Sequence, residues 1–185
     1  GNGFVTRALL AMGMDVEELD SSGRTPLVRA AMKHQEAICK MLLEKGASVG
    51  ALKAFTSWTP LASAAFNNNE ALCEFLVEKG CTLCLNTEQK NQLKPKLSRR
   101  IHDAAQNGHK TALQLLLDMG ADINEKNPHG KTALLEAVFY NHLSCVKILI
   151  KRGADATISD HIGGSVLHRA AQRLTDDEMM KFLLE

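Results

Sequence analysis

Apolar residues recur along this chain at the spacing of helix faces. Ile38, Met41 and Leu42 stand at positions i, i+3 and i+4, and the same spacing returns in residues 72–76. Residues three and four apart lie on one face of an α-helix, so this pattern predicts amphipathic helices. Each of these helices must cover its apolar face with another element.

Two short phrases recur together along the chain. The first reads Thr-Pro-Leu and then Ala-Ala; it begins at Thr25 and Thr59, with related copies at Ser165, Thr132 and Arg99. The second pairs aliphatic residues with a later glycine, and these glycines are Gly13, Gly46, Gly80, Gly120 and Gly153. Successive glycines are 33, 34, 40 and 33 residues apart. The chain therefore repeats about every 33 residues, with one insertion.

The repeat has a clear physical meaning. Proline after threonine suits an early helical position, where its missing N–H is not needed. Glycine after the aliphatic pair suits a helix end, where a left-handed residue is required. A single unit cannot cover its own apolar face, but stacked units can, and each buried Leu or Ile then contributes roughly 1.5–3 kcal/mol.

These phrases resemble the ankyrin repeat, and the resemblance covers essentially the whole chain. It implies an all-α ankyrin-repeat solenoid, in which β-hairpin fingers join about five and a half stacked helix-turn-helix units. We expect a single domain over 1–185, with repeats near 1–19 (partial), 20–53, 54–93, 94–126, 127–159 and 160–185 (partial) and an insertion at 84–98. The incomplete first and last units indicate a fragment of a longer protein.

Composition narrows the class of protein further. The formal charge is +1, which argues against a chain that is basic throughout, as for nucleic acid or a membrane surface. Five cysteines make a disulfide scaffold improbable, and neither a membrane-length apolar stretch nor a signal peptide is evident. We expect a soluble protein of a reducing intracellular compartment, cytoplasmic and/or nuclear.

Strings that imitate active-site motifs are explained by the repeat. Gly130-Lys131-Thr132 ends like a phosphate loop, but Glu125 stands where that motif needs its first glycine. Cys81 and Cys84 form one C-x-x-C pair, whereas a structural zinc site needs four ligands. Most of the seven histidines fill regular repeat positions. We therefore predict no catalytic residues, no metal and no cofactor.

The resemblance also implies where a partner binds, because ankyrin arrays usually use their hairpin tips and the inner face of each first helix. The matching partner-binding positions include Met32, Lys33, Phe55, Trp58, Phe66, Asn67, Gln106, Asn107, Phe139, Tyr140 and Arg173. Five of the eight aromatic residues fall on this set, and aromatic residues are enriched at interface centres. The alternative is that some of them pack against neighbouring hairpins.

The insertion is basic. Residues 89–100, at and just after its end, hold Lys90, Lys94, Lys96, Arg99 and Arg100 and no acidic residue, and Arg99-Arg100 replaces Thr-Pro. We expect a solvated loop here; the alternative is a site for an acidic partner or a phosphate. A separate pattern around Asn124 resembles the substrates of asparaginyl hydroxylases and makes hydroxylation of Asn124 an open alternative.

The sequence as a whole predicts a scaffold that binds another protein, as a peptide or helix and of acidic, amphipathic character, through its concave face. One alternative is a regulatory or targeting segment of a larger enzyme, channel or immune-type sensor. A weaker alternative is binding of phosphate or nucleic acid at the basic insertion. The fold alone names no partner, because the same fold serves many.

Overall fold

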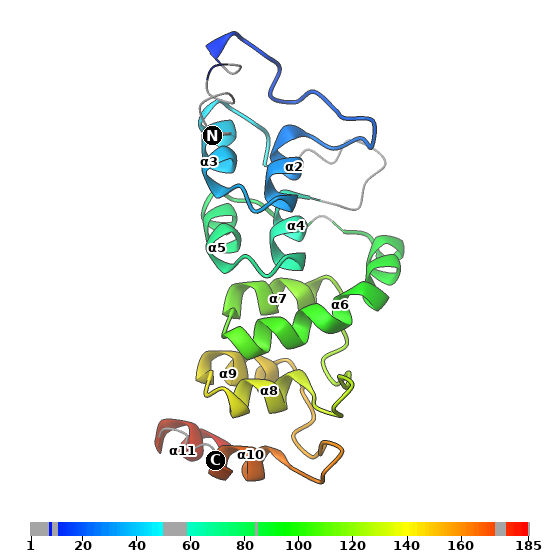
Figure 1. Ribbon diagram of the computed structural model, residues 1–185, viewed down its shortest axis with the longest axis vertical. Helices are drawn as coiled ribbons and strands as arrows, with labels where there is room; N and C mark the ends of the chain where they lie inside the picture. The colour runs from blue at the N-terminus through cyan, green and yellow to red at the C-terminus, as the bar shows by residue number, and fades with distance from the viewer. Residues whose placement is uncertain (1–7, 9–10, 50–58, 84, 173–176, 185) are drawn as a thin grey trace. The chain divides into compact units, whose positions relative to one another are not determined.

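The described helices follow one another in antiparallel pairs (Figure 1). This computed structural model describes residues 8, 11–49, 59–83, 85–172 and 177–184. The chain divides into two units, residues 1–89 and 90–185. The helices are α2 (Pro26–Met32), α3 (Glu36–Glu44), α4 (Pro60–Phe66), α5 (Glu70–Glu78), α6 (Thr87–Asn107), α7 (Lys110–Asp118), α8 (Ala133–Phe139), α9 (Leu143–Lys151), α10 (Val166–Gln172) and α11 (Asp177–Leu184). The all-α fold expected from the repeat is confirmed.

Within each unit, corresponding helices of neighbouring repeats pack on one another. In the first unit α2 packs on α3 and α4, and α4 packs on α5. In the second unit α8 packs on α9 and α10, and α7 packs on α9. The predicted apolar faces form the core, where Leu42, Leu72 and Leu76 are buried and alanine pairs such as Ala64-Ala65 allow close approach of the first helices.

Threonine starts three of the short first helices. The hydroxyl groups of Thr25, Thr59 and Thr132 accept hydrogen bonds from backbone N–H groups three residues later, at 3.3, 2.9 and 3.4 Å. Such a bond satisfies one of the N–H groups that a helix leaves unpaired at its start. The Thr-Pro phrase is therefore a helix-start signal, as the sequence predicts.

A left-handed residue joins the two helices of a repeat. His34, Asn68, Gly108 and Asn141 occupy this position, with φ between 52° and 72°. At Gly108 the requirement is also steric, since an added Cβ would lie 2.6 Å from Nδ1 of His142 in the following repeat. The neighbouring repeats therefore touch at this turn.

The basic insertion forms a helix, and our expectation of a solvated loop was wrong. α6 runs for 21 residues, whereas the other first helices have seven. Its start is fixed by a reciprocal capping box, in which the N–H of Gln89 donates to Oδ1 of Asn86 and the N–H of Asn86 donates to Oε1 of Gln89, both at 2.9 Å.

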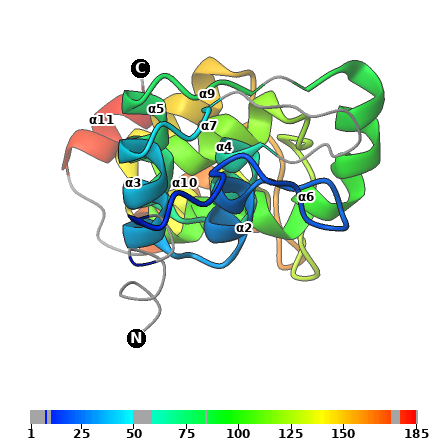
Figure 2. The ribbon, with the colours of Figure 1, turned by 90° about the horizontal axis from the view of Figure 1, so that it is seen from above.

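Leucines hold this extension to the protein. Leu93, Leu97 and Ile101 are spaced by four residues and are buried, so they form one face of α6. An added Cβ on Gly120, at the end of α7, would lie 3.6 Å from the Cβ of Lys90. α6 bends along its length (Figure 1), and it contains Pro95, which lacks the N–H of the helical hydrogen bond. The first turns of α6 consequently lie on the hairpin side of this unit (Figure 2).

Candidate protein-interaction surface

Three hairpin tips are closed by the same polar arrangement. The side chains of Asp20, Asn127 and Asp160 each accept hydrogen bonds from backbone N–H groups two and four residues later, at 2.8–3.1 Å. The residue three positions later is glycine with φ between 71° and 77°. Short polar side chains and a left-handed glycine are what such turns require.

A side chain nine residues further on reaches back to each tip. Arg29 contacts Asp20 at 3.1 Å, and the amide of Asn127 donates to Glu136 at 2.9 Å. Arg169 pairs with Asp160, and both side chains are buried. Burial raises the pKa of Asp160, but hydrogen bonds from Arg169, Gly164 and Ile162 outweigh it and hold that pKa below 3.8.

Repeat four has none of these closing groups. Counting back from Asp103, which matches Arg29, Glu136 and Arg169, Lys94 stands at the Asp/Asn position and Leu97 at the glycine position. Arg99 stands at the threonine position and lies 3.8 Å from Asp103 within the same helix. The chain therefore continues as α6 where the other repeats form a hairpin.

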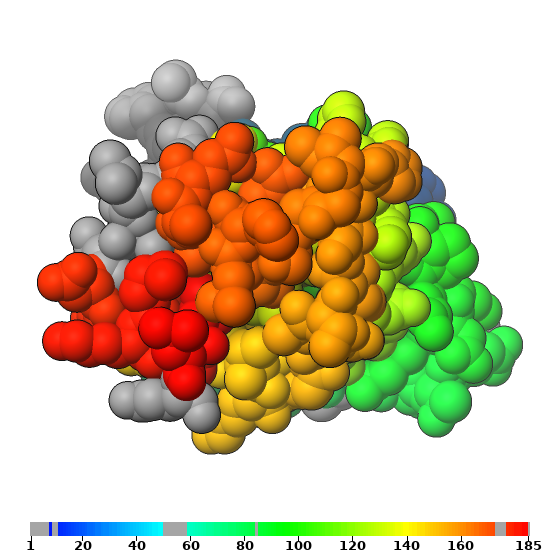
Figure 3. Space-filling view, turned by 90° about the horizontal axis from the view of Figure 1, so that it is seen from below, coloured from blue at the N-terminus to red at the C-terminus, as the bar shows by residue number. Residues whose placement is uncertain are grey.

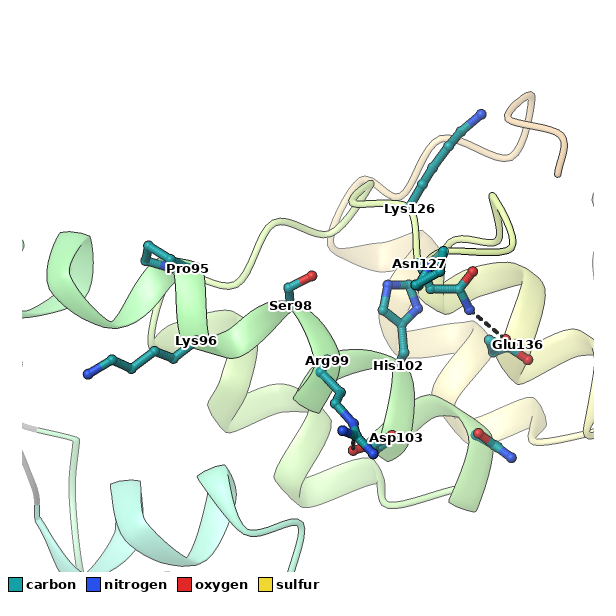
Figure 4. A pocket seen from close by; sticks show the side chains of 11 residues that line it. Pro95, Lys96, Ser98, Arg99, His102, Asp103, Lys126, Asn127 and Glu136 are labelled. Carbon is teal, nitrogen blue, oxygen red and sulfur yellow. Dashed lines mark hydrogen bonds and ion pairs between the residues drawn. The ribbon is translucent and has the colours of Figure 1, made fainter. Parts of the chain in front are cut away.

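A pocket of about 700 Å³ lies between α6 and the hairpin of repeat five (Figure 4). Pro95, Arg99, His102 and Gln106 line it from one face of α6. Lys126, Asn127 and Pro128 line it from the hairpin, and Glu136 lines it from α8. The space-filling view shows the start of α6 and this hairpin side by side (Figure 3). Sequence reasoning missed this pocket, because it treated the insertion as a loop.

His102 is a buried polar residue in this pocket. It is only 6% exposed; its ring interacts with the backbone of Glu125, but neither ring nitrogen completes a hydrogen bond of good geometry to a described residue. Burial lowers the pKa of His102 below 6.5, although the charges of Glu136, Glu125 and Asp103 and the backbone of Glu125 oppose this. The imidazole is therefore favoured in its neutral form, which has one donor and one acceptor nitrogen.

Both cationic and acidic side chains line the pocket. Lys94, Lys96 and Arg99 are exposed on α6, whereas Lys90 and Arg100 are half-buried. Lys126 donates to the carbonyl oxygen of Ser159 at 3.1 Å. The predicted basic residues thus lie on one helix, but only Lys96 and Arg99 among them line the pocket.

Predicted inner-face residues of the second unit form an aromatic cluster. Tyr140 is 39% exposed, and its ring stands edge-to-face on Phe139 at 5.1 Å. Nε2 of Gln106 donates to the Tyr140 hydroxyl at 3.1 Å, and Nε2 of His142 donates to the carbonyl oxygen of Gln106 at 2.9 Å. Lys131 Nζ lies 4.6 Å from the centre of the Phe139 ring. Asn107, the residue after Gln106, is exposed at the end of α6.

The matching residues of the first unit are less exposed. Met32, Phe66 and Asn67 are half-buried, and Lys33 is exposed. The Asn67 amide donates to the carbonyl oxygen of Met32 at 3.2 Å. Part of each predicted binding set therefore also ties one repeat to the next. The predicted residues Phe55, Trp58 and Arg173 lie outside the described residues.

Other candidate chemistry has a structural explanation. Cys39, Cys73 and Cys81 are buried, and burial raises their thiol pKa values to about 12, 12 and 11. Cys84 lies outside the described residues. No group of three metal-binding side chains occurs among the residues that the structure describes, and no described helix has the length and apolarity to cross a membrane. Asn124 Oδ1 accepts from the N–H of Asp155 at 2.9 Å; its hydroxylation stays a prediction.

The comparison with known families agrees with this repeat geometry. A family described as ankyrin repeats (3 copies) matches residues 1–91 and 101–185. The chain belongs to the ankyrin-repeat family. The unmatched residues 92–100 lie in the extension of α6, so the structural departure and the departure from the family coincide.

Relatives share the ankyrin repeats and are much longer. The chain is similar to the ADP-ribosylation factor GTPase-activating protein AGD2 of Arabidopsis thaliana, at 40% identity over 46% of this chain and 11% of that protein. It is similar to human inversin, at 38% identity over 48% of this chain and 8% of inversin. It is also similar to human SH3 and multiple ankyrin repeat domains protein 2, at 31% identity over 85% of this chain and 8% of that protein. This ankyrin chain thus spans about a tenth of these relatives.

Proposed function

We propose that this ankyrin chain binds a partner protein through its inner helices and hairpin tips, without catalysis. The observation that carries the proposal is the aromatic cluster of Phe139 and Tyr140. Tyr140 is exposed, yet its ring and hydroxyl are held by Phe139 and Gln106. A rigid aromatic side chain gives an interface large contact area at low entropic cost.

The hairpin tips extend this surface in the second unit. Ile162 is 83% exposed at the tip of repeat six, beside the exposed His161. Exposed apolar groups with polar neighbours are typical of protein interaction sites. The family supports the same function, since repeat arrays bind through extended concave surfaces.

The test is affinity capture from a lysate of the source cells with Tyr140→Ala beside the wild type. Val77→Ala is the matched control, because Val77 is a similarly exposed apolar residue on the second helix α5. We expect partners to be lost with Tyr140→Ala and kept with Val77→Ala, since central aromatic residues contribute about 2 kcal/mol or more to binding. Partners kept by both variants would contradict the proposal.

A second candidate function follows from the length of the relatives. Each aligns with this chain over about a tenth of its own length, and one is named as a GTPase-activating protein. The chain would then position or regulate another domain of a longer protein. Activity of the full-length gene product with and without residues 1–185 tests this; equal activity and equal localisation contradict it.

An intracellular site of action, cytoplasmic or nuclear, is also part of the proposal. Buried thiols at Cys39, Cys73 and Cys81 support it, because free cysteines persist in reducing compartments. Fluorescence microscopy of the tagged gene product tests this placement, and secretion into the medium would contradict it.

A further inference from the structure

The pocket lies where repeat four would have its hairpin, since the chain there continues as α6 instead. The hairpin of repeat five touches the hairpin of repeat six on the side away from this pocket, because an added Cβ on Gly130 would clash with the ring of His161. Toward repeat four that hairpin faces α6 across about 700 Å³. This volume lies within the roughly 300–1,000 Å³ of ligand pockets, and an extended chain segment would occupy the place that a hairpin takes elsewhere.

The buried histidine selects the chemistry of the occupant. Figure 4 shows the His102 ring pointing toward Asn127. The backbone of Glu125 interacts with this ring, but neither nitrogen completes a hydrogen bond of good geometry to the described residues. A neutral imidazole can donate one hydrogen bond and accept another. A peptide backbone offers both partners, an N–H donor and a C=O acceptor. A fully ionised phosphate offers acceptors only.

The charges point the same way. Asp103 and Glu136 lie in the wall of the pocket, where they would repel a doubly charged phosphate. Lys96, Arg99 and Lys126 carry positive charge there, and among the described residues neither lysine forms an ion pair with a carboxylate. Side chains with a single negative charge can meet these cations while the backbone stays near His102.

We propose that this pocket binds an extended segment of a partner protein that carries aspartate or glutamate. The proposal rests on the proposed function and deepens it, because it names the chemistry of the partner. Gln106 joins the two surfaces: it lines the pocket and donates to the Tyr140 hydroxyl. A segment that leaves the pocket along Gln106 reaches the aromatic cluster.

The experiment selects peptides from a random decapeptide library displayed on phage, with the full chain as target. Affinities of the selected peptides are then measured by fluorescence anisotropy. We expect enrichment of Asp and Glu, and affinity reduced about tenfold or more by Ser98→Tyr, because the half-buried Ser98 lines the pocket. Ser98→Ala is the matched control that leaves the pocket open, and its affinity stays at the wild-type value.

A charge test complements the steric test. Lys96→Gln with Arg99→Gln removes two cations from the pocket and is expected to weaken the selected peptide about tenfold or more. Lys45→Gln with Lys151→Gln removes the same charge from exposed positions at the ends of α3 and α9, and binding should be retained. Circular dichroism of each variant checks that helicity is unchanged.

Four results overturn this proposal. They are selection of neutral or basic peptides, undiminished binding by Ser98→Tyr, and competition by inorganic phosphate or tighter binding when phosphoserine replaces the acidic residue. Partners still captured through Tyr140 would then leave the proposed function standing. Conversely, acidic peptides that bind the pocket while Tyr140→Ala captures every partner would overturn the proposed function alone.

Discussion

The hairpin of repeat six and the corresponding part of α6 in repeat four show how few side chains decide between a hairpin and a helix. At repeat six, Asp160 accepts two backbone hydrogen bonds and pairs with the buried Arg169, and Gly163 has φ of 77°. At repeat four the corresponding positions hold Lys94, Asp103 and Leu97.

Each replacement removes one requirement of the turn. Lys94 cannot accept the backbone hydrogen bonds, and Leu97 strongly disfavours positive φ. Asp103 instead pairs with Arg99 one helical turn earlier, as i, i+4 pairs do on a helix. The same position in the repeat thus forms a closed hairpin in repeat six and a helix beside a pocket in repeat four.

The largest expected effect comes from a substitution that destabilises the hairpin of repeat six. Asp160→Ala leaves Arg169 buried without its carboxylate, so we expect a loss of about 3–5 kcal/mol in the free energy of unfolding. Urea denaturation followed by circular dichroism measures it. Asp20→Ala, at the equivalent but only half-buried site, should cost less. Equal small losses in both variants would show that the buried pair of Asp160 and Arg169 does not stabilise the hairpin of repeat six as stated.

The next effect tests the docking of the helical extension. Leu97 is fully buried on α6, and Leu97→Ala is expected to cost about 2–5 kcal/mol of unfolding free energy through loss of burial and a cavity. Lys94→Ala, on an exposed position of the same helix, should change stability by less than about 0.5 kcal/mol. If both substitutions are neutral, the extension is not packed as a helix.

A smaller effect compares the two kinds of helix start. Thr59→Ala removes the hydroxyl that caps α4, at an expected cost of about 1 kcal/mol. Arg99→Ala changes the equivalent residue of repeat four, which lies inside α6 and is 88% exposed, so its expected cost is below about 0.5 kcal/mol. Chemical denaturation separates the two, and equal costs would argue for a helix start at Arg99.

The pH dependence of stability gives the smallest and most local test. Because the folded pKa of His102 lies below 6.5, the unfolded chain takes up a proton first as the pH falls through 6.5. His102 therefore destabilises the fold progressively from about pH 6.5 down to its folded pKa, and the loss is complete below it. His102→Gln should flatten this part of the stability–pH curve. An unchanged slope would show that His102 does not titrate abnormally.

The repeat made most of this fold predictable from sequence. Thr-Pro marks helix starts, and the glycines that recur about every 33 residues mark helix ends. Both signals act over a few residues of local backbone. The aliphatic faces of α3 and α5 followed from their period alone. The exposure of Tyr140 agrees with its predicted place, although its bond to Gln106 depends on two side chains from different repeats.

The helical extension escaped prediction for a physical reason. A run of lysine and arginine with a proline suggests a solvated loop, and that composition outweighed the signals for a helix. Those signals were present in Asn86 and Gln89 three residues apart, and in Leu93, Leu97 and Ile101 four residues apart. The pocket and the burial of His102 depend on how the extension packs on the next repeat, which no local pattern specifies.

The most direct test of the pocket is an NMR titration of the ¹⁵N-labelled chain with an acidic peptide from the selection. We expect the amide resonances of residues 96–103 and of Lys126 and Asn127 to shift in a saturable manner, while those of α3 and α5 stay in place. Ser98→Tyr should abolish the shifts and Ser98→Ala should preserve them. Shifts confined to residues outside the pocket, or shifts that persist in Ser98→Tyr, would contradict the account.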